Sequence, residues 1–460
     1  MKRFVVLSLL TGCSWASFDS LAGSTWVDSA GPPKGADTTK YGANLVAGGA
    51  APTNGGMNVL VLGRTNPDVS RLSYDANGVV SQGDAGDVLT ALQFLKFDDL
   101  HPAVAGDPAS SMVAFTMVTR DGAVGGDKDA NTKWVFYDTA TTGSDGPKYI
   151  TQHEGPVKSK DISSGIVFSA AGENLDPASK PDLSDLVISR GPDIMIMADW
   201  ALPEGSVNGN PSTYKLYACH HKEPTAFGVA LGEFDSTHSG REILLATGPL
   251  EGSTGPSKIK GIAPESVVGH DAAAIGDCFT SDTVLFEIDK TASGIKDLGK
   301  QLLVTTIKDT GGNTISAIVA SAPASNKLFV FTGEHGTNEI DVPTPDGAGD
   351  FGTSLAVGDL DGDGVDELAV GGPKSTADGV TDAGSVFVFK WNATTMNYDL
   401  AATLHDASPD IEQHFGQSVA IVPFGSAGKH VLVTGSDNEV FTYFRLSPLY
   451  ADVRAGRAAQ

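Results

Sequence analysis

The sequence predicts an all-β fold made of four-stranded antiparallel sheets that repeat along the chain. Three observations predict it. A segment rich in Gly and Asp recurs about every 60 residues, aromatic and β-branched strands follow each copy, and no long stretch has the period of a helix. Glycine supplies 55 of the 460 residues, an excess that is typical of chains with many turns and close backbone contacts.

The repeat is clearest in two segments that align without a gap. They are FGVALGEFDSTHSGREILLATGP (227–249) and FGTSLAVGDLDGDGVDELAVGGP (351–373), and the alignment places Asp235 on Asp359. Further copies, from clear to blurred, begin at Phe415, Tyr41, Leu298, Ser164 and Val88. So many copies in order are difficult to explain as unrelated hairpins.

Each copy is followed by at least one further strand. These strands are RLSY (71–74), KWVFY (133–137), KLY (215–217), TVLF (283–286), KLFVF (327–331), SVFVF (385–389) and EVFTYF (439–444). A unit therefore comprises three strands and usually a fourth, as NYDLAATL (397–404) illustrates. The units predict a seven-bladed β-propeller of four-stranded antiparallel blades, in which neighbouring blades bury each other's apolar faces. Six or eight blades are the alternatives if the units near 88 and 164 are misread.

We expect the propeller to occupy residues 41–447, followed by a polar tail at 448–460. The last unit has only three evident strands, so its fourth must come from elsewhere. The segment STWV (24–27) is the nearest candidate, and we expect it to pair with the outer edge of the last blade, close to Val440. Residues 28–40, rich in Pro, Gly and Asp, then form a linker.

The N-terminus has the pattern of a secretory signal. Lys2 and Arg3 precede an apolar stretch that is too short to span a bilayer. The sequence LTGC ending at Cys13 resembles the lipobox of bacterial lipoprotein signal peptides, which implies removal of residues 1–12 and acylation of Cys13. Acyl chains would then anchor a soluble domain in the bacterial cell envelope, at the outer membrane or facing the periplasm. The alternative is an ordinary signal cut near Ala16 and a secreted protein.

The charge of the chain limits its partners. A formal net charge of −25 argues against a nucleic-acid partner, because a phosphate backbone requires a basic surface. It also argues against docking on anionic lipid, so we expect membrane contact only through the N-terminal anchor. The charge suits divalent cations and a soluble monomer.

Two cysteines follow Cys13. Cys219 and Cys278 form an even pair, which permits a disulfide in an oxidising compartment, and two buried free thiols are the alternative. His220 and His221 beside Cys219 also allow a soft-metal site. Adjacent residues on a strand point to opposite faces, however, and so converge poorly on one ion.

The segment from Asp359 to Glu367, DLDGDGVDE, predicts a calcium site. Ca²⁺ takes six to eight hard oxygen ligands, which carboxylates at alternate positions of a tight loop supply. Asp359, Asp361 and Asp363 would contribute side chains, Val365 its carbonyl, and Glu367 would close the site. Gly364 permits the sharp turn that this requires. The alternatives are an ion-free turn and Mg²⁺, which prefers water-rich octahedral sites.

Two other loops have weaker versions of this pattern. In the copy at 227–249, Thr237 and Ser239 follow Asp235 where the better site has aspartates, so a second metal loop there has lost two charges. The loop at residues 308–313 is similarly degraded.

These segments resemble the FG-GAP repeat, which is found in the integrin α-subunit propeller and in many bacterial surface proteins. The resemblance is strong at 227–249 and 351–373 and weak near 88 and 164. It implies a propeller whose calcium loop joins the first and second strands of a blade. That family usually has Asp where Glu367 stands, and Asp366, one position earlier, is a possible alternative ligand.

No catalytic motif stands out in the chain. It has no G-x-S-x-G, H-E-x-x-H or C-x-x-C, and GPSKIKG (255–261) lacks the spacing of a phosphate loop. Asp193, His270 and His335 are isolated candidates of no defined role. We therefore expect a non-enzymatic, calcium-stabilised surface scaffold that binds a protein or a glycan, as in adhesion. The alternative is an enzyme, a lyase or hydrolase, that acts on extracellular polysaccharide.

Overall fold

The structure is a computed structural model, and most of its described residues lie in β-strands. It describes residues 27–30, 41–50, 57–62, 68–74, 80–87, 95–105, 112–121, 130–138, 149–153, 167–172, 185–190, 193–201, 213–220, 226–232, 234, 242–247, 258–268, 270, 276–277, 284–360, 363–406, 408–423 and 430–443. The short 3₁₀ helices of this part are η2 (Pro264–Ser266), η4 (Thr291–Ser293), η5 (Pro323–Ser325) and η6 (Glu334–Gly336).

The first half of the chain forms consecutive antiparallel sheets. One has the order β2 (Asn44–Ala50), β3 (Met57–Leu62), β4 (Asp68–Tyr74), β5 (Val80–Asp87), and the next has β6 (Leu95–Ala105), β7 (Met112–Asp121), β8 (Ala130–Asp138), β9 (Tyr149–His153). A third has β10 (Val167–Gly172), β11 (Asp185–Arg190), β12 (Asp193–Ala201), β13 (Thr213–His220). The two-residue strand β17 (Gly276–Asp277) adds to β13 in parallel and makes this last sheet five-stranded.

The second half continues the series. Its sheets are β14 (Ala226–Gly232), β15 (Glu242–Thr247), β16 (Lys258–Ile262), β18 (Val284–Asp289); then β19 (Leu302–Lys308), β20 (Thr314–Ala322), β21 (Lys327–Thr332), β22 (Asn338–Asp341); and then β23 (Ser354–Gly358), β24 (Glu367–Gly372), β25 (Ser385–Asn392), β26 (Asn397–Leu404). The prediction of an all-β chain with four-stranded antiparallel sheets is thereby confirmed.

The last sheet combines the two ends of the described chain. It contains β27 (Ser418–Pro423), β28 (His430–Gly435), β29 (Val440–Tyr443) and, on its outer edge, β1 (Val27–Ala30). In the antiparallel ladder Val27 lies opposite Tyr443 and Ala30 opposite Val440. Residues 28–30 are therefore strand, where the sequence predicted linker. Val27 of the expected segment 24–27 pairs as predicted with the outer edge of the last sheet, and residues 24–26 lie outside the described residues. An edge strand tolerates such polar residues because it shares its ladder with one neighbour only.

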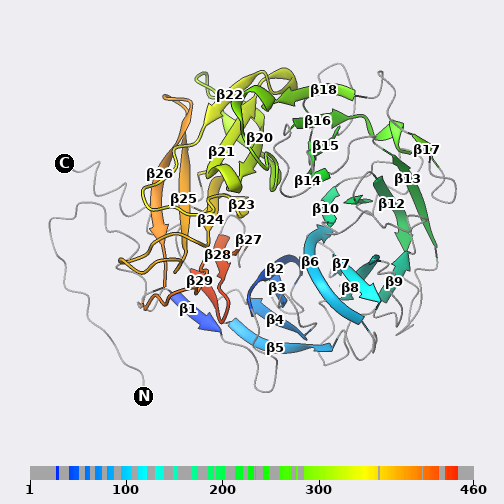
Figure 1. Cartoon of the computed structure of the whole chain (residues 1–460), viewed down its shortest axis with the longest axis horizontal. Helices are drawn as coiled ribbons and strands as arrows, with labels where there is room; N and C mark the ends of the chain where they lie inside the picture. The colour runs from blue at the N-terminus through cyan, green and yellow to red at the C-terminus, as the bar shows by residue number, and fades with distance from the viewer. Residues whose placement is uncertain are drawn as a thin grey trace.

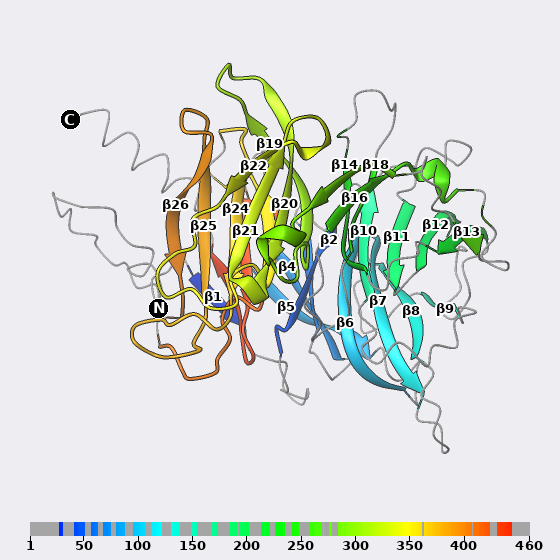
Figure 2. The same cartoon turned by 45° about the horizontal axis from the view of Figure 1, so that its top comes forward.

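The first strands of successive sheets contact one another in a cycle. β2 contacts β6, β6 contacts β10, β10 contacts β14, β14 contacts β19, β19 contacts β23, β23 contacts β27, and β27 contacts β2. Figure 1 shows the sheets following one another in chain order around a centre, and the tilted view in Figure 2 shows the neighbouring sheets side by side. This arrangement fits a propeller.

The core lies between neighbouring sheets, as strand β20 shows. Ile318 and Ala320 pack into a cluster shared with β14–β16, whereas Ala317 and Val319 pack into a cluster shared with β24 and β25. Alternate residues of a strand point to opposite faces, so this strand buries both of its faces against different sheets. The second cluster includes Phe351, which is fully buried.

A hydrogen bond between neighbouring sheets recurs beside the glycine turn that precedes a first strand. Ser354 in β23 donates its hydroxyl to the Gly416 carbonyl of the next sheet over 2.8 Å. Ser418 in β27 makes the same bond to the Gly42 carbonyl over 2.6 Å, which links the last sheet to the first. Both glycines are left-handed, with φ of +85° at Gly416 and +84° at Gly42, so the turn requires glycine there.

A second glycine makes room for this contact. A Cβ atom added to Gly371, in β24, would lie 1.9 Å from the Gly416 carbonyl oxygen, and one added to Gly435 would lie 1.9 Å from that of Gly42. No side chain can occupy that space, because the obstacle is backbone. The glycines at the end of the second strand therefore allow neighbouring sheets to approach.

Some strands differ from the sequence predictions. KLY lies in β13, and residues 284–286 of TVLF lie in β18. Both are fourth strands of their sheets, because β12 and β16 precede them. β12 was missed because its apolar run does not alternate with polar residues. β16 overlaps the end of the GPSKIKG segment, where the sequence predicts no strand. The first strand of the second unit, β6, begins at Leu95, and residues 88–94 lie outside the described residues.

Gly435→Ala tests the contact between the last and first sheets. We expect a loss of unfolding free energy of about 2–3 kcal/mol from overpacking against backbone, and about 1 kcal/mol for Ser418→Ala, which removes one hydrogen bond. Denaturant unfolding of both variants measures this. The matched control is Ser408→Ala, at an exposed loop serine, which should unfold like the parent protein. Parent-like stability of Gly435→Ala would contradict the contact.

Candidate metal centre

The predicted calcium loop joins the first two strands of its sheet. β23 ends at Gly358, which pairs with Glu367 at the start of β24, so residues 359–366 form the connection. Of the predicted ligands, Asp359, Asp363, Val365 and Glu367 are described, whereas Asp361 lies outside the described residues.

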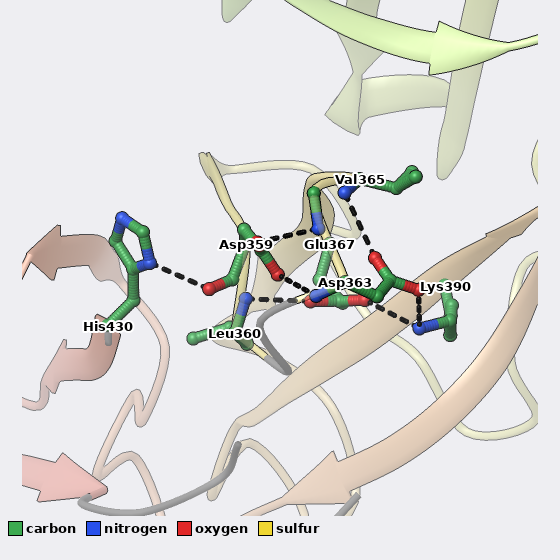
Figure 3. A network of polar contacts seen from close by, with 8 residues as sticks. Asp359, Leu360, Asp363, Val365, Glu367, Lys390 and His430 are labelled. Atoms are coloured by element: carbon green, nitrogen blue, oxygen red, sulfur yellow. Dashed lines mark hydrogen bonds and ion pairs between the residues drawn. The ribbon is translucent and has the colours of Figure 1, made fainter. Parts of the chain in front are cut away.

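Asp359 organises this loop (Figure 3). Its two carboxylate oxygens accept the backbone N–H groups of Asp363 over 3.0 Å and of Gly364 over 2.8 Å. Asp363 in turn accepts the N–H of Val365 over 2.9 Å. Gly364 has a φ of +79°, as expected for the residue at the sharp turn.

Glu367 is buried beneath the loop and is held from two sides. Its Oε2 accepts the backbone N–H of Leu360 over 2.7 Å, and its Oε1 lies 3.3 Å from the Nζ atom of Lys390 in β25. The same ammonium group lies 2.8 Å from Oδ2 of Asp363 (Figure 3). Lys390 thus bridges two carboxylates that the sequence predicts as calcium ligands. No sequence pattern predicted Lys390 itself as a residue of this site.

A buried glutamate recurs at the start of another second strand. Glu242 of β15 is buried and its Oε2 accepts the N–H of Phe234 over 2.7 Å. Glu242 pairs with Gly232 as Glu367 pairs with Gly358. The loop before Glu242 is therefore one residue longer. The gapless alignment of the two copies places Gly232 on Ala356 and Glu242 on Asp366, so it is out of register in both strands that flank the loop. Register is set by the ladder, so sequence similarity alone could not locate the insertion.

The loop also contacts both neighbouring sheets. Asp366, the alternative ligand, accepts a hydrogen bond from the Thr305 hydroxyl of β19 over 3.0 Å. On the other side, Nδ1 of His430, in β28, donates to the Asp359 carbonyl over 2.6 Å (Figure 3). Through these two bonds the loop contacts the sheet on either side of its own. No local sequence pattern indicated these contacts.

Among the described residues, no group of three or more His, Cys, Asp or Glu side chains has the geometry of a metal site. The weaker loop residues Asp235, Thr237 and Ser239 lie outside the described part of the chain. In the degraded loop at 308–313, the carboxylate of Asp309 accepts the Asn313 side chain over 2.9 Å and the Asn313 N–H over 2.7 Å. These bonds lower the pKa of Asp309.

Cys219 in β13 is buried and disulfide-bonded. Its partner lies outside the described residues, as do Cys13 and Cys278, so the pairing with Cys278 stays a prediction. In the parallel ladder Cys219 lies opposite Gly276 of β17, two residues before Cys278 in the sequence. Of the isolated candidates, His335 has a φ of +58° and stacks on Phe286, with ring centroids 5.5 Å apart.

The comparisons with known proteins point to the same segment. Residues 351–389 match the FG-GAP repeat family, a span that covers β23, β24, the loop between them and most of β25. No curated protein shows significant similarity to the chain. Within the part that the structure describes, no helix is long and apolar enough to cross a membrane. An FG-GAP repeat and four-stranded antiparallel sheets suggest an integrin-like surface or binding scaffold.

Tyr398→Phe tests the packing beneath the loop. The Tyr398 hydroxyl is buried without a hydrogen-bond partner, and its ring packs edge-on against Trp391, with centroids 5.1 Å apart. We expect the substitution to raise the unfolding free energy by about 1 kcal/mol, because it removes an unsatisfied buried group. The measurement is denaturant unfolding.

The same variant has a pH signature. Burial, followed by the charges of Asp366 and Glu367, raises the pKa of Tyr398. A raised folded-state pKa means that stability is present below the unfolded pKa of about 10 and is lost as pH rises above it. Tyr398→Phe should therefore unfold less readily at alkaline pH. The control is Tyr443→Phe. The Tyr443 hydroxyl donates to the His405 carbonyl, so its removal should lower the unfolding free energy at neutral pH. Identical alkaline unfolding of parent and Tyr398→Phe would contradict the assignment.

Proposed function

We propose that the chain is a seven-bladed, calcium-stabilised β-propeller that serves as a non-enzymatic binding scaffold on the bacterial cell envelope. The observation that carries this proposal is the cycle of contacts between the first strands of successive sheets, together with the FG-GAP match at residues 351–389. Each sheet is one blade, and β1 completes the last blade by pairing with β29.

The donor set of the loop suits calcium. The carboxylates of Asp359, Asp363 and Glu367 offer only oxygen, the ligand that Ca²⁺ prefers, and the place between Asp363 and Glu367 already accommodates a positive charge. Calcium would be held by these three side chains with Asp361 and the Val365 carbonyl. Bound there, it would neutralise clustered carboxylates and stiffen the loop, and it would have no catalytic part.

The loops at the opposite end of the blades support a binding role. The loops between β24 and β25 and between β26 and β27 contain non-glycine residues in the left-handed conformation, with φ between +49° and +60°. These residues are Asp378, Asp382, Glu412 and His414. They also carry Ile411, an apolar side chain that is 74% exposed. Loops held in such defined conformations by a rigid framework are typical of recognition surfaces. The ligand is a protein or a glycan, as for adhesion-like scaffolds.

Calcium binding is the first test of this function. Isothermal titration of the chelator-treated protein should show calcium binding, and calcium should raise the melting temperature. Asp361→Ala and Asp363→Asn should weaken the affinity at least about tenfold, because each removes a charged ligand. Asp399→Asn, on the exposed edge strand β26, is the control and should bind like the parent. Absence of calcium heat in the parent protein contradicts the calcium assignment.

The anchor and the ligand form a separate test. Expressed with its leader, the chain should incorporate labelled palmitate and partition into detergent, and Cys13→Ala should do neither. The mature domain should bind a defined glycan or protein on an array of envelope glycans and purified surface proteins. Turnover of an extracellular polysaccharide by the purified domain would overturn the non-enzymatic assignment.

A further inference from the structure

Lys390 occupies a distinctive place beside the loop. It follows Phe389, which pairs with Leu368, so it lies on β25 next to the start of β24. Its ammonium group lies 2.8 Å from Oδ2 of Asp363 and 3.3 Å from Oε1 of Glu367. It stands one residue beyond the span that matches the FG-GAP repeat.

The Glu367 side chain requires a counter-charge, because it is fully buried. A buried carboxylate is costly unless it is paired and hydrogen-bonded. The Leu360 N–H satisfies one of its oxygens, and Lys390 lies against the other. The lysine side chain itself is 25% exposed, so its ammonium has a route to solvent.

Lys390 and a calcium ion would use the same oxygen atoms. Ca²⁺ binds oxygen at 2.3–2.6 Å. An ammonium group in contact with Asp363 and Glu367 would then lie within a few ångströms of the ion, where like charges repel strongly. The two cations therefore exclude each other from this place.

We propose that Lys390 is the resident cation of the loop and sets its calcium affinity. In the metal-free protein the ammonium group neutralises Asp363 and Glu367. Calcium binds only by displacing it toward solvent, so the loop responds to the higher concentrations found outside cells, for which weak sites of about 10⁻⁴ to 10⁻³ M are typical. This inference rests on the proposed calcium function.

The test compares Lys390→Met, which keeps the apolar stem and removes the charge, with the parent protein. Titration calorimetry should show calcium affinity at least about tenfold tighter in Lys390→Met, because one like charge is removed. In EGTA the melting temperature of this variant should be lower than that of the parent, since two carboxylates lose their counter-charge. Lys390→Arg keeps the charge and should retain weak affinity.

Lys374→Met is the matched control. Lys374 forms an ion pair with Asp350 over 2.7 Å, away from the loop. Lys374→Met should therefore bind calcium with the same affinity as the parent protein. If Lys390→Met is too unstable in EGTA, Lys390→Gln purified with calcium gives the same affinity comparison.

The outcomes separate the two proposals. Calcium binding by the parent and Lys390→Met with equal affinity overturns the role of Lys390 and leaves the calcium site standing. Absence of calcium binding in both proteins overturns the calcium assignment, and the role of Lys390 with it. Tighter binding by Lys390→Met together with a lower melting temperature in EGTA supports both.

Discussion

The packing of neighbouring sheets depends on the close approach of a glycine carbonyl to the second strand of the preceding sheet. The Gly42 carbonyl fits against Gly435, and the Gly416 carbonyl against Gly371, only because both second-strand residues lack a Cβ atom. A serine hydroxyl then satisfies the buried carbonyl, which would otherwise be costly to bury. The same glycine–serine contact joins the last sheet to the first, so it also completes the cycle of contacts between sheets.

This packing positions the candidate metal loop. Because neighbouring sheets are held at short range, Thr305 of one neighbour can reach Asp366 and His430 of the other can reach Asp359. The counter-charge, by contrast, comes from the loop's own sheet, where Lys390 lies beside Glu367. Several hydrogen bonds therefore hold the described part of the loop, and no single interaction sets its conformation. A bound cation would change the net charge of the loop more than its backbone conformation.

Much of the candidate loop could be predicted from the sequence, because its chemistry is local. Alternate aspartates, a glycine at the turn and a following strand occupy consecutive positions. In the structure Asp359 accepts N–H groups of the loop and Gly364 is left-handed. The buried glutamates show the limit. Glu242 corresponds to Glu367 only through the ladders in which each pairs with a glycine, and a gapless alignment of the two copies missed it.

The strand content, the repeated unit and the acidic loop could be predicted from the sequence, because alternation and turn chemistry act between residues close in the chain. The structure alone shows that residues 28–30 belong to the edge strand β1, that β17 pairs with β13 in parallel, and that Lys390 contacts the loop carboxylates. Those contacts join residues far apart in sequence. Their partners are selected by the register of the ladders and by packing between sheets, which a single strand's pattern does not encode.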